Sequence, residues 1–354
     1  MKRKLKIAQI APLWFPVPPQ KYGGTERIIS YLTEGLIKKG HQVTLFGSGD
    51  SKTKAKLVSL TKKSLIGRGI PWSDWWWNSF NYSFAFEGAK NFDLIHSHWT
   101  PLGFYFQKFT KTPVVHTFHN TPKKDDHRWE IFDYYKNEAK AVFISKSQRE
   151  NSPIRFKKNW VIYNGIEIEK FRFNPKPKNH FIWIGRISKD KGIENAIGVA
   201  KKMGINLILA GQLQPANFNY FEKKVKPHLS SKIRYIGEIN QRELSSFYAN
   251  ALAFLYPLEW QEPFGLCMAE SMASGTPVIA FDNGSAKEVI KSGKTGFVVP
   301  YLKSGQKNIE GLIRAVKKIN NIKRADCRNW VEENFSSEKM VENYEKIYYQ
   351  LVKN

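Results

Sequence analysis

Two acidic side chains, Glu262 and Glu270, stand eight positions apart in the segment EWQEPFGLCMAESMASG. If a helix begins near Pro263, its rise of about 1.5 Å per residue separates the two carboxylates by roughly 12 Å. That span matches a nucleotide sugar from its ribose to its hexose. The backbone amides of Phe264, Gly265 and Leu266 would lie at the helix start, where a diphosphate is stabilised. The alternative is a pair of ordinary solvated carboxylates.

Two cations follow an apolar run in the second half of the chain. Arg186 and Lys191 belong to GRISKDKG, which directly follows the apolar run FIWI. Ligands of parallel α/β sheets bind at the carboxyl ends of the strands, so both side chains should reach the ligand. Fixed cations there would stabilise a departing nucleoside diphosphate, whose negative charge grows as its bond to the sugar breaks.

The first half of the chain offers a glycine pair and several histidines. Gly23 and Gly24 lie in WFPVPPQKYGGTER, between an apolar run and a helical pattern, and would let the backbone approach a ligand closely. A turn before a helix capped by Thr25 is the alternative. His119 follows the strand-like run in VVHTFHN and could hydrogen-bond a sugar hydroxyl. The histidines His96, His98 and His116 also stand at predicted strand ends, with a structural role as the alternative.

The elements around these residues alternate between short apolar runs and helical patterns. The run KLKIAQIAPL, the amphipathic pattern ERIISYLTEGLIKKG and the run HQVTLFGSG form a predicted βαβ unit. We read the first run as a buried strand, because it lacks the cleavage site of a signal peptide. A proline-containing segment, FRFNPKPKNH, reads as a linker, after which the pattern starts again. We therefore predict two doubly wound Rossmann-like α/β domains, 1–170 and 171–335, with a C-terminal helix 336–354 completing the first domain and a cleft between them.

In order and spacing, these segments resemble glycosyltransferase family 4. The motifs are KIAQIAPLWFPVPPQKYGGTER, VVHTFHN, VIYNGIE, GRISKDKG, EPFGLCMAE, GTPVIA, Glu288 and TGFVV. The resemblance implies a GT-B fold and a retaining transfer that forms an α-linked product, with the leaving phosphate helping to deprotonate the attacking hydroxyl. It implies that Arg186 and Lys191 bind the donor phosphates and that His119 lies next to the reacting sugar.

The expected site can now be stated residue by residue. Glu262 is assigned to the donor sugar and Glu270 to the ribose, since a separation of roughly 12 Å exceeds that of the paired acids of glycoside hydrolases. The catalytic set is Glu262, His119, Arg186 and Lys191, and the donor-binding set adds Gly23, Gly24, Phe264, Gly265, Leu266 and Glu270. No Asp-x-Asp motif is found, so neither a metal nor another cofactor is expected. A UDP-sugar is favoured over GDP-mannose, although AGQLQ lacks the usual second glycine beside the expected base pocket.

Composition narrows the partners and the location. The chain carries 56 Lys and Arg against 31 Asp and Glu, a net charge of +25, and only two cysteines, Cys267 and Cys327. The cysteine spacing fits a reducing compartment and predicts a cytoplasmic protein. The tryptophans of PWSDWWWNSFNYSF follow the basic stretch 52–68, which suggests a peripheral contact with an anionic membrane, with aromatic packing in the core as the alternative.

The same residues fit several acceptors and several functions. A glycan, a lipid-linked molecule or a small molecule would each suit as acceptor. A sugar-nucleotide epimerase or a phosphorylase of the same fold is an alternative function. A basic nucleic-acid-binding protein explains the charge but neither the glutamates nor the Arg and Lys pair, and no nucleic-acid motif is found, so no nucleic acid is expected as partner.

Overall fold

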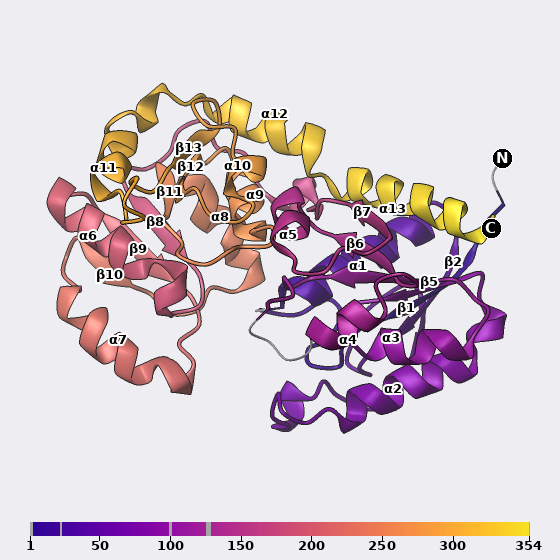
Figure 1. Cartoon of the computed structure of the whole chain (residues 1–354). Helices are drawn as coiled ribbons and strands as arrows, with labels where there is room; N and C mark the ends of the chain where they lie inside the picture. Colours follow the sequence, from indigo (N-terminus) through magenta and orange to yellow (C-terminus); the bar gives the residue numbers. More distant parts are fainter. Residues whose placement is uncertain (1–2, 22, 99–100, 125–128, 354) are drawn as a thin grey trace. The chain divides into compact units, whose positions relative to one another are not determined.

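The computed structural model describes residues 3–21, 23–98, 101–124 and 129–353 (Figure 1). The chain forms two compact units, each described here by itself. Unit 1 comprises Met1–Gly165 together with Ser337–Asn354, and unit 2 comprises Ile166–Ser336. The sequence pattern predicts these two boundaries after residues 170 and 335. Of the predicted domains, residues 1, 2, 22, 99, 100, 125–128 and 354 lie outside the described part.

Unit 1 is built on a parallel sheet of seven strands in the order β3-β2-β1-β4-β5-β6-β7. The strands are β1 (Lys6–Ile10), β2 (Gln42–Phe46), β3 (Lys56–Val58), β4 (Leu94–Ser97), β5 (Val114–Phe118), β6 (Lys140–Phe143) and β7 (Lys158–Val161). The doubly wound sheet is confirmed, and KLKIAQIAPL supplies its first strand as predicted. The strand order reverses between β1 and β4, the place where such sheets bind ligands.

The helices of unit 1 include one from the far end of the chain. They are α1 (Gly24–Lys38), α2 (Trp76–Glu87), α3 (Leu102–Phe106), α4 (Trp129–Tyr134), α5 (Lys146–Asn151) and α13 (Ser337–Val352). Helix α13, yellow in Figure 1, packs on α1 and β4. Its Glu345 accepts a hydrogen bond from His41 Nε2 at 3.0 Å and pairs with Lys39 at 3.2 Å.

Unit 2 repeats the plan with six parallel strands in the order β10-β9-β8-β11-β12-β13. The strands are β8 (Phe181–Ile184), β9 (Leu207–Ala210), β10 (Ile233–Tyr235), β11 (Ala253–Tyr256), β12 (Val278–Phe281) and β13 (Gly296–Val299). Its helices are α6 (Ile193–Met203), α7 (Phe218–Lys224), α8 (Gln241–Asn250), α9 (Leu266–Ala273), α10 (Ala286–Val289), α11 (Ile309–Lys317) and α12 (Arg324–Asn334). The strand order reverses between β8 and β11, so the loops after these two strands border the expected ligand position.

One segment differs from the sequence prediction. The segment predicted as a linker runs along unit 2, where the Lys178 amide donates to the Asn250 carbonyl at 2.8 Å and that of Asn174 to the Ser274 carbonyl at 3.3 Å. Within the described residues, no helix combines the length and the apolar character that crossing a bilayer requires.

Candidate active site

The loops after β8 and β11 meet at the carboxyl edge of the unit 2 sheet. The first loop contains Arg186 and a short 3₁₀ turn, Lys189–Lys191, and the second leads to Glu262. The Glu259 amide donates to the Asp190 carbonyl at 2.8 Å, which ties the two loops together. The indole of Trp183 on β8 donates to the Lys191 carbonyl at 3.1 Å and fixes its backbone. The strand-order reversal therefore brings two segments about 70 residues apart into one site.

A single carboxylate oxygen collects three donors in this site. Glu262 Oε2 accepts from Lys191 Nζ at 2.8 Å, from Trp260 Nε1 at 2.9 Å and from the Tyr256 hydroxyl at 3.1 Å. The Lys191 ammonium also lies 4.2 Å from the centre of the Trp260 ring, within cation–π range. The side chains of Lys191 and Glu262 are only 13% and 12% exposed, so the ion pair is largely desolvated. The cation and the carboxylate that the sequence assigned to different parts of the donor are thus directly paired.

Two titratable side chains beside Glu262, those of Tyr256 and Cys267, stay protonated and neutral. Burial, and then the nearby Cys267 and Glu262, raise the pKa of Tyr256 well above its usual range, so its hydroxyl stays a donor to Glu262. Burial, followed by the charges of Glu262 and Glu270, raises the pKa of the Cys267 thiol to about 12. Cys267 is consequently a neutral thiol and no nucleophile at neutral pH.

The helix between the two glutamates begins later than predicted. Helix α9 starts at Leu266 with Gly265 as its N-cap, so Pro263 is not its first residue and Glu262 lies in the loop before it. Gly265 has φ of 76°, a left-handed conformation that side chains rarely adopt and that turns the chain into the helix. The estimate of roughly 12 Å assumed one continuous helix at about 1.5 Å per residue and is wrong in that premise.

The predicted donor-binding residues at this helix start have different environments. The Phe264 side chain is buried against the ring of Phe335, 5.5 Å away, and its carbonyl accepts from the Ser285 hydroxyl at 2.7 Å. Leu266 is half-buried at the first helical position. The amides of the first helical turn have no carbonyl partner within a helix, so Leu266 and the next residue supply the donors that an anion could use.

Glu270 lies inside α9 and is only 5% exposed. Its Oε2 accepts from the Tyr248 hydroxyl at 3.1 Å. The other end of α9 is held by two arginines of α12. Arg328 donates to the Ala273 carbonyl at 2.9 Å, and Arg324 donates to the carbonyl of the C-cap Ser274 at 3.4 Å. Arg324 also donates to the Ala249 and Ala251 carbonyls at the end of α8, both at 2.9 Å. These cations at the C-terminus of α9 suit its dipole and fix the helix that carries Glu270.

Arg186 is the more accessible of the two predicted phosphate-binding cations. Its guanidinium is 34% exposed and pairs with Asp190 at 3.3 Å. A partly exposed pair of this length contributes little to stability, so the guanidinium is available to a ligand at small cost.

In unit 1, the glycine pair forms the start of α1. Gly23 is the N-cap, with φ of 137°, and Gly24 is the first helical residue. Thr25 therefore lies inside the first turn and is not the cap. Glu26, one residue on, is 4% exposed, and burial raises its pKa to about 7 despite the neighbouring Arg27.

His119 ends a chain of buried polar groups in unit 1. His98 Nε2 is 2.6 Å from Gln9 Oε1, and His98 Nδ1 is 3.1 Å from His119 Nε2. Because an amide oxygen only accepts, His98 carries its proton on Nε2 and accepts on Nδ1 from His119. Burial lowers the pKa of His119 to about 4, so the ring is neutral and its Nδ1 is left as an acceptor.

The series of buried polar side chains in unit 1 extends to the C-terminal helix α13. His96 Nδ1 lies 2.6 Å from the Tyr348 hydroxyl, and His96 Nε2 lies 2.7 Å from Thr117 Oγ1. Burial, with the charges of the neighbouring histidines, lowers the pKa values of His96 and His98 well below their usual range. His96 and His116 lie within β4 and β5 rather than at the strand ends, and both are fully buried. Their structural reading is favoured over an acceptor-side role.

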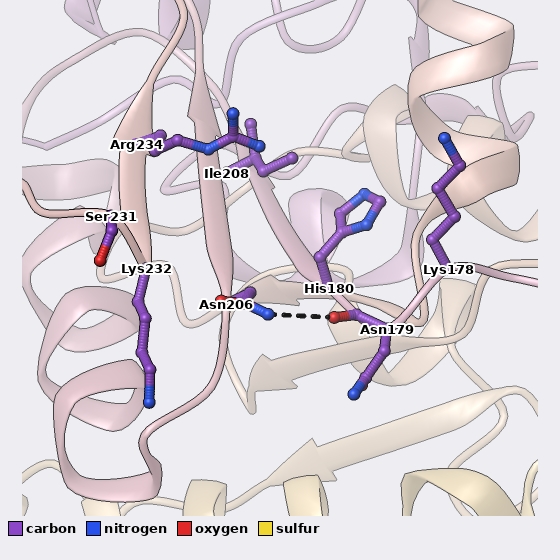
Figure 2. A pocket seen from close by; sticks show the side chains of 8 residues that line it. All are labelled: Lys178, Asn179, His180, Asn206, Ile208, Ser231, Lys232 and Arg234. Atoms are coloured by element: carbon purple, nitrogen blue, oxygen red, sulfur yellow. Dashed lines mark hydrogen bonds between the residues drawn. The ribbon is translucent and has the colours of Figure 1, made fainter.

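A hollow lies at the opposite edge of the unit 2 sheet from Lys191 and Glu262 (Figure 2). It has a volume of about 320 Å³ and is lined by Lys178, Asn179, His180, Asn206, Ile208, Ser231, Lys232 and Arg234. These residues precede or begin β8, β9 and β10, and none belongs to the predicted site. Within the described ranges no group of three or more His, Cys, Asp or Glu side chains could hold a metal ion.

Sequence reasoning missed several residues of the site. Trp260, Tyr256 and Tyr248 hydrogen-bond the two glutamates, and Gln9 sets the protonation of His98. Gln9 did carry a signal, because it is a polar residue inside an otherwise apolar strand.

Comparisons with known proteins identify the family and agree with the fold. Residues 22–170 match the family described as Glycosyltransferase Family 4, and residues 166–335 match Glycosyl transferases group 1. An uncharacterized glycosyltransferase of Methanocaldococcus jannaschii is 24% identical over 334 residues, covering 82% of this chain and 85% of that protein. Sucrose-phosphate synthase of Thermosynechococcus elongatus superposes with a TM-score of 0.81 at 21% identity, covering 99% of this chain and all (100%) of that one. HepE of Anabaena, solved in complex with UDP-glucose, superposes with a TM-score of 0.75 at 16% identity, covering 98% of this chain and 100% of that one.

Proposed function

The chain belongs to the glycosyltransferases of family 4 and group 1, and we propose that it moves a hexose from a nucleotide-diphosphate sugar to an acceptor hydroxyl with retention, forming an α-linkage. The observation that carries the proposal is the Lys191 and Glu262 pair between the carboxyl ends of β8 and β11. A lone buried ion pair adds little stability, which favours a role in ligand binding for this one.

The roles of the unit 2 residues follow from their donors and charges. An ammonium has three N–H donors, so Lys191 can keep its hydrogen bond to Glu262 and still donate to phosphate oxygens. Arg186 supplies the second cation. Glu262 Oε1, which makes no hydrogen bond to the described residues, accepts from a sugar hydroxyl, and Glu270 accepts from the ribose. Gly23, Gly24, Gly265 and the amides after it complete the donor contacts.

In the proposed transfer, the acceptor oxygen attacks the anomeric carbon from the side of the leaving group. The bond from this carbon to the phosphate oxygen breaks, and the acceptor proton passes to that oxygen. Arg186 and Lys191 stabilise the growing negative charge of the nucleoside diphosphate. Neutral His119 holds a sugar hydroxyl through Nδ1, its protonation set by His98 and Gln9. We assign the phosphate contacts to these cations instead of a metal, and activity that needs added Mg²⁺ or Mn²⁺ after EDTA treatment would contradict this.

The donor and the location are part of the proposal. We favour a UDP-sugar over GDP-mannose, because the structural relative HepE was solved with UDP-glucose. A glycan, a glycolipid or a small molecule provides the acceptor hydroxyl. Both cysteines are free thiols, which suits the reducing cytoplasm.

The test is a thermal-shift and hydrolysis screen against UDP-glucose, UDP-N-acetylglucosamine, UDP-galactose and GDP-mannose. One donor should stabilise the wild-type protein, and Glu270→Ala should weaken that shift. Glu222→Ala, on the surface of α7, is the matched control. No response to any donor would refute the proposal.

Two further measurements separate related chemistries. Epimerisation of the donor without an acceptor would identify an epimerase, and dependence on inorganic phosphate would identify a phosphorylase. Once an acceptor is found, the anomeric configuration of the product, read by NMR, decides between retention and inversion.

A further inference from the structure

Large exposed aromatic side chains are concentrated in one part of unit 1. Among the described residues, seven lie between positions 72 and 134, whereas unit 2 exposes only two such rings, Phe173 and Phe218. The seven are Trp72 (50% exposed), Trp76 (82%), Phe80 (52%), Phe84 (38%), Tyr105 (37%), Phe109 (83%) and Tyr134 (68%). Single exposed apolar residues are common, but a concentration of this kind indicates a binding surface.

Helix α2 carries three of them on one side. Trp76, Phe80 and Phe84 are spaced four residues apart and so line one stripe of the helix. The opposite side is already used, because Tyr82, Ala85 and Phe86 pack into the core with strands β1, β2, β4 and β5. A helix that is apolar on both sides is normally buried on both sides. Figure 1 shows α2 on the outside of unit 1. The side chains of its second apolar stripe are exposed.

Helix α3 packs on α2 and also contacts the residue that follows α4. Phe86 of α2 lies 5.5 Å from Phe106 of α3, and Tyr105 of α3 lies 6.5 Å from Tyr135, directly after α4. The 3₁₀ turn after α3, Gln107–Phe109, presents Phe109. We call Trp76, Phe80, Phe84, Tyr105, Phe109 and Tyr134 the aromatic face.

Positive charge surrounds the aromatic face. The segment 52–138, which includes the whole aromatic face, contains 13 Lys and Arg against eight Asp and Glu, and the excess lies in its first part, where 52–68 contains six Lys and Arg and no Asp or Glu. Arg68 lies 4.7 Å over the Trp77 ring and donates to Thr61 Oγ1 at 3.0 Å, which places the exposed Lys62 and Lys63 near the start of α2. Beside α4, Lys108 lies 4.7 Å from the centre of the Tyr134 ring and pairs with Glu138 at 3.6 Å. Aromatic rings beside lysines suit the interface of an anionic bilayer, where rings enter the headgroup layer and ammonium groups meet lipid phosphates.

We propose that the aromatic face docks unit 1 on the surface of an anionic lipid bilayer. The rings of α2 insert among the headgroups, and the surrounding lysines bind the negative surface. Docking does not depend on sugar transfer; only its consequence, access to an acceptor carried on a lipid, rests on the proposed function.

The experiment is co-sedimentation of the full chain with vesicles, without sugar nucleotide. Wild type should bind vesicles containing phosphatidylglycerol at low salt and bind phosphatidylcholine vesicles weakly. Trp76→Ser, Phe80→Ser and Phe84→Ser together should weaken binding more than about tenfold. Lys62→Gln with Lys63→Gln should weaken it about 25-fold, since each basic residue near the surface contributes about fivefold. Phe218→Ser, an equally exposed ring of unit 2, is the control and should change nothing.

Several results would overturn the proposal. One is no binding of the wild type to anionic vesicles, and another is undiminished binding by the triple aromatic variant. A third is a wild-type dimer, seen by light scattering, that the triple variant dissociates, because the face would then be an interface between copies. Thermal shift with a sugar nucleotide, run on the same proteins, reports folding and donor binding separately. Vesicle binding by a protein that responds to no donor would leave the docking surface standing while the proposed function fails.

Discussion

Glu262→Gln preserves the shape of the side chain at the centre of the site and removes its charge. Lys191, Trp260 and Tyr256 all donate to Glu262 Oε2, at 2.8, 2.9 and 3.1 Å. A glutamine oxygen can still accept, but the Lys191 ammonium then loses its counter-charge in a site where it is 13% exposed. Breaking a buried pair in this way costs about 3 kcal/mol, whereas an exposed pair contributes about 1 kcal/mol or less. We therefore expect Glu262→Gln to destabilise unit 2 by about 3 kcal/mol.

Lys191→Met should cost less than Glu262→Gln. It leaves the carboxylate with the Trp260 and Tyr256 donors, so we expect about 1–2 kcal/mol. The double variant should cost less than the sum of the single variants by about 1 kcal/mol or more, because the second substitution removes a charge that already lacks its partner.

Hydrogen exchange of peptides from unit 2 is the suitable assay, since two units need not unfold in one transition. Glu222 and Lys226 on the surface provide the matched pair, at 2.7 Å with side chains 54% and 58% exposed. Glu222→Gln should change stability by less than about 0.5 kcal/mol. A cost below about 1 kcal/mol for Glu262→Gln, or full additivity with Lys191→Met, would refute the reasoning that the pair is desolvated and coupled.

Three other predictions concern groups away from this pair. Burial raises the pKa of Glu26 from 4.5 to about 7, so between these pH values the unfolded chain releases a proton that the native protein keeps. The free energy of unfolding should therefore fall by up to about 3 kcal/mol as pH rises from 4.5 to 7. Urea titrations should show this fall in the wild type and not in Glu26→Gln. Burial, followed by the charge of Lys140, lowers the pKa of His116 from 6.5 to about 3. The free energy of unfolding should therefore fall by about 1.4 kcal/mol per pH unit as the pH drops below 6.5. The same urea titrations should show a shallower fall in His116→Gln. Arg324→Met should lower the free energy of unfolding by about 3 kcal/mol, because it leaves the buried carbonyls that Arg324 contacts without donors. Thermal unfolding measures the change. An unchanged midpoint temperature would show that water replaces the guanidinium.

The fold could be read from the sequence because its signals are local. Apolar runs that end in polar residues predicted most strands, and the amphipathic spacing of Ile28, Ile29, Leu32 and Leu36 predicted α1, where all four are buried. Strand β3 gave no such signal, because it has only three residues in a lysine-rich stretch and is only partly buried.

The site was only partly predictable, for a physical reason. Glu262, Lys191 and Glu270 stood out by type and spacing, but their partners depend on strand order and side-chain orientation. Trp260 and Tyr248 look like core aromatics in the sequence, and only tertiary contacts give their polar atoms a role. The late start of α9 depends on Gly265 adopting a left-handed conformation, which competes with the helical reading of Pro263.

Helix α13 has a consequence for the order in which the protein is made. Unit 2 is continuous, from Ile166 to Ser336, whereas unit 1 also needs Ser337–Asn354. All of unit 2 is therefore synthesised before unit 1 receives its last helix. Until then His96 lacks the hydroxyl of Tyr348, and the apolar residues that α13 covers remain open to chaperones. The half of the protein synthesised first is thus the half completed last.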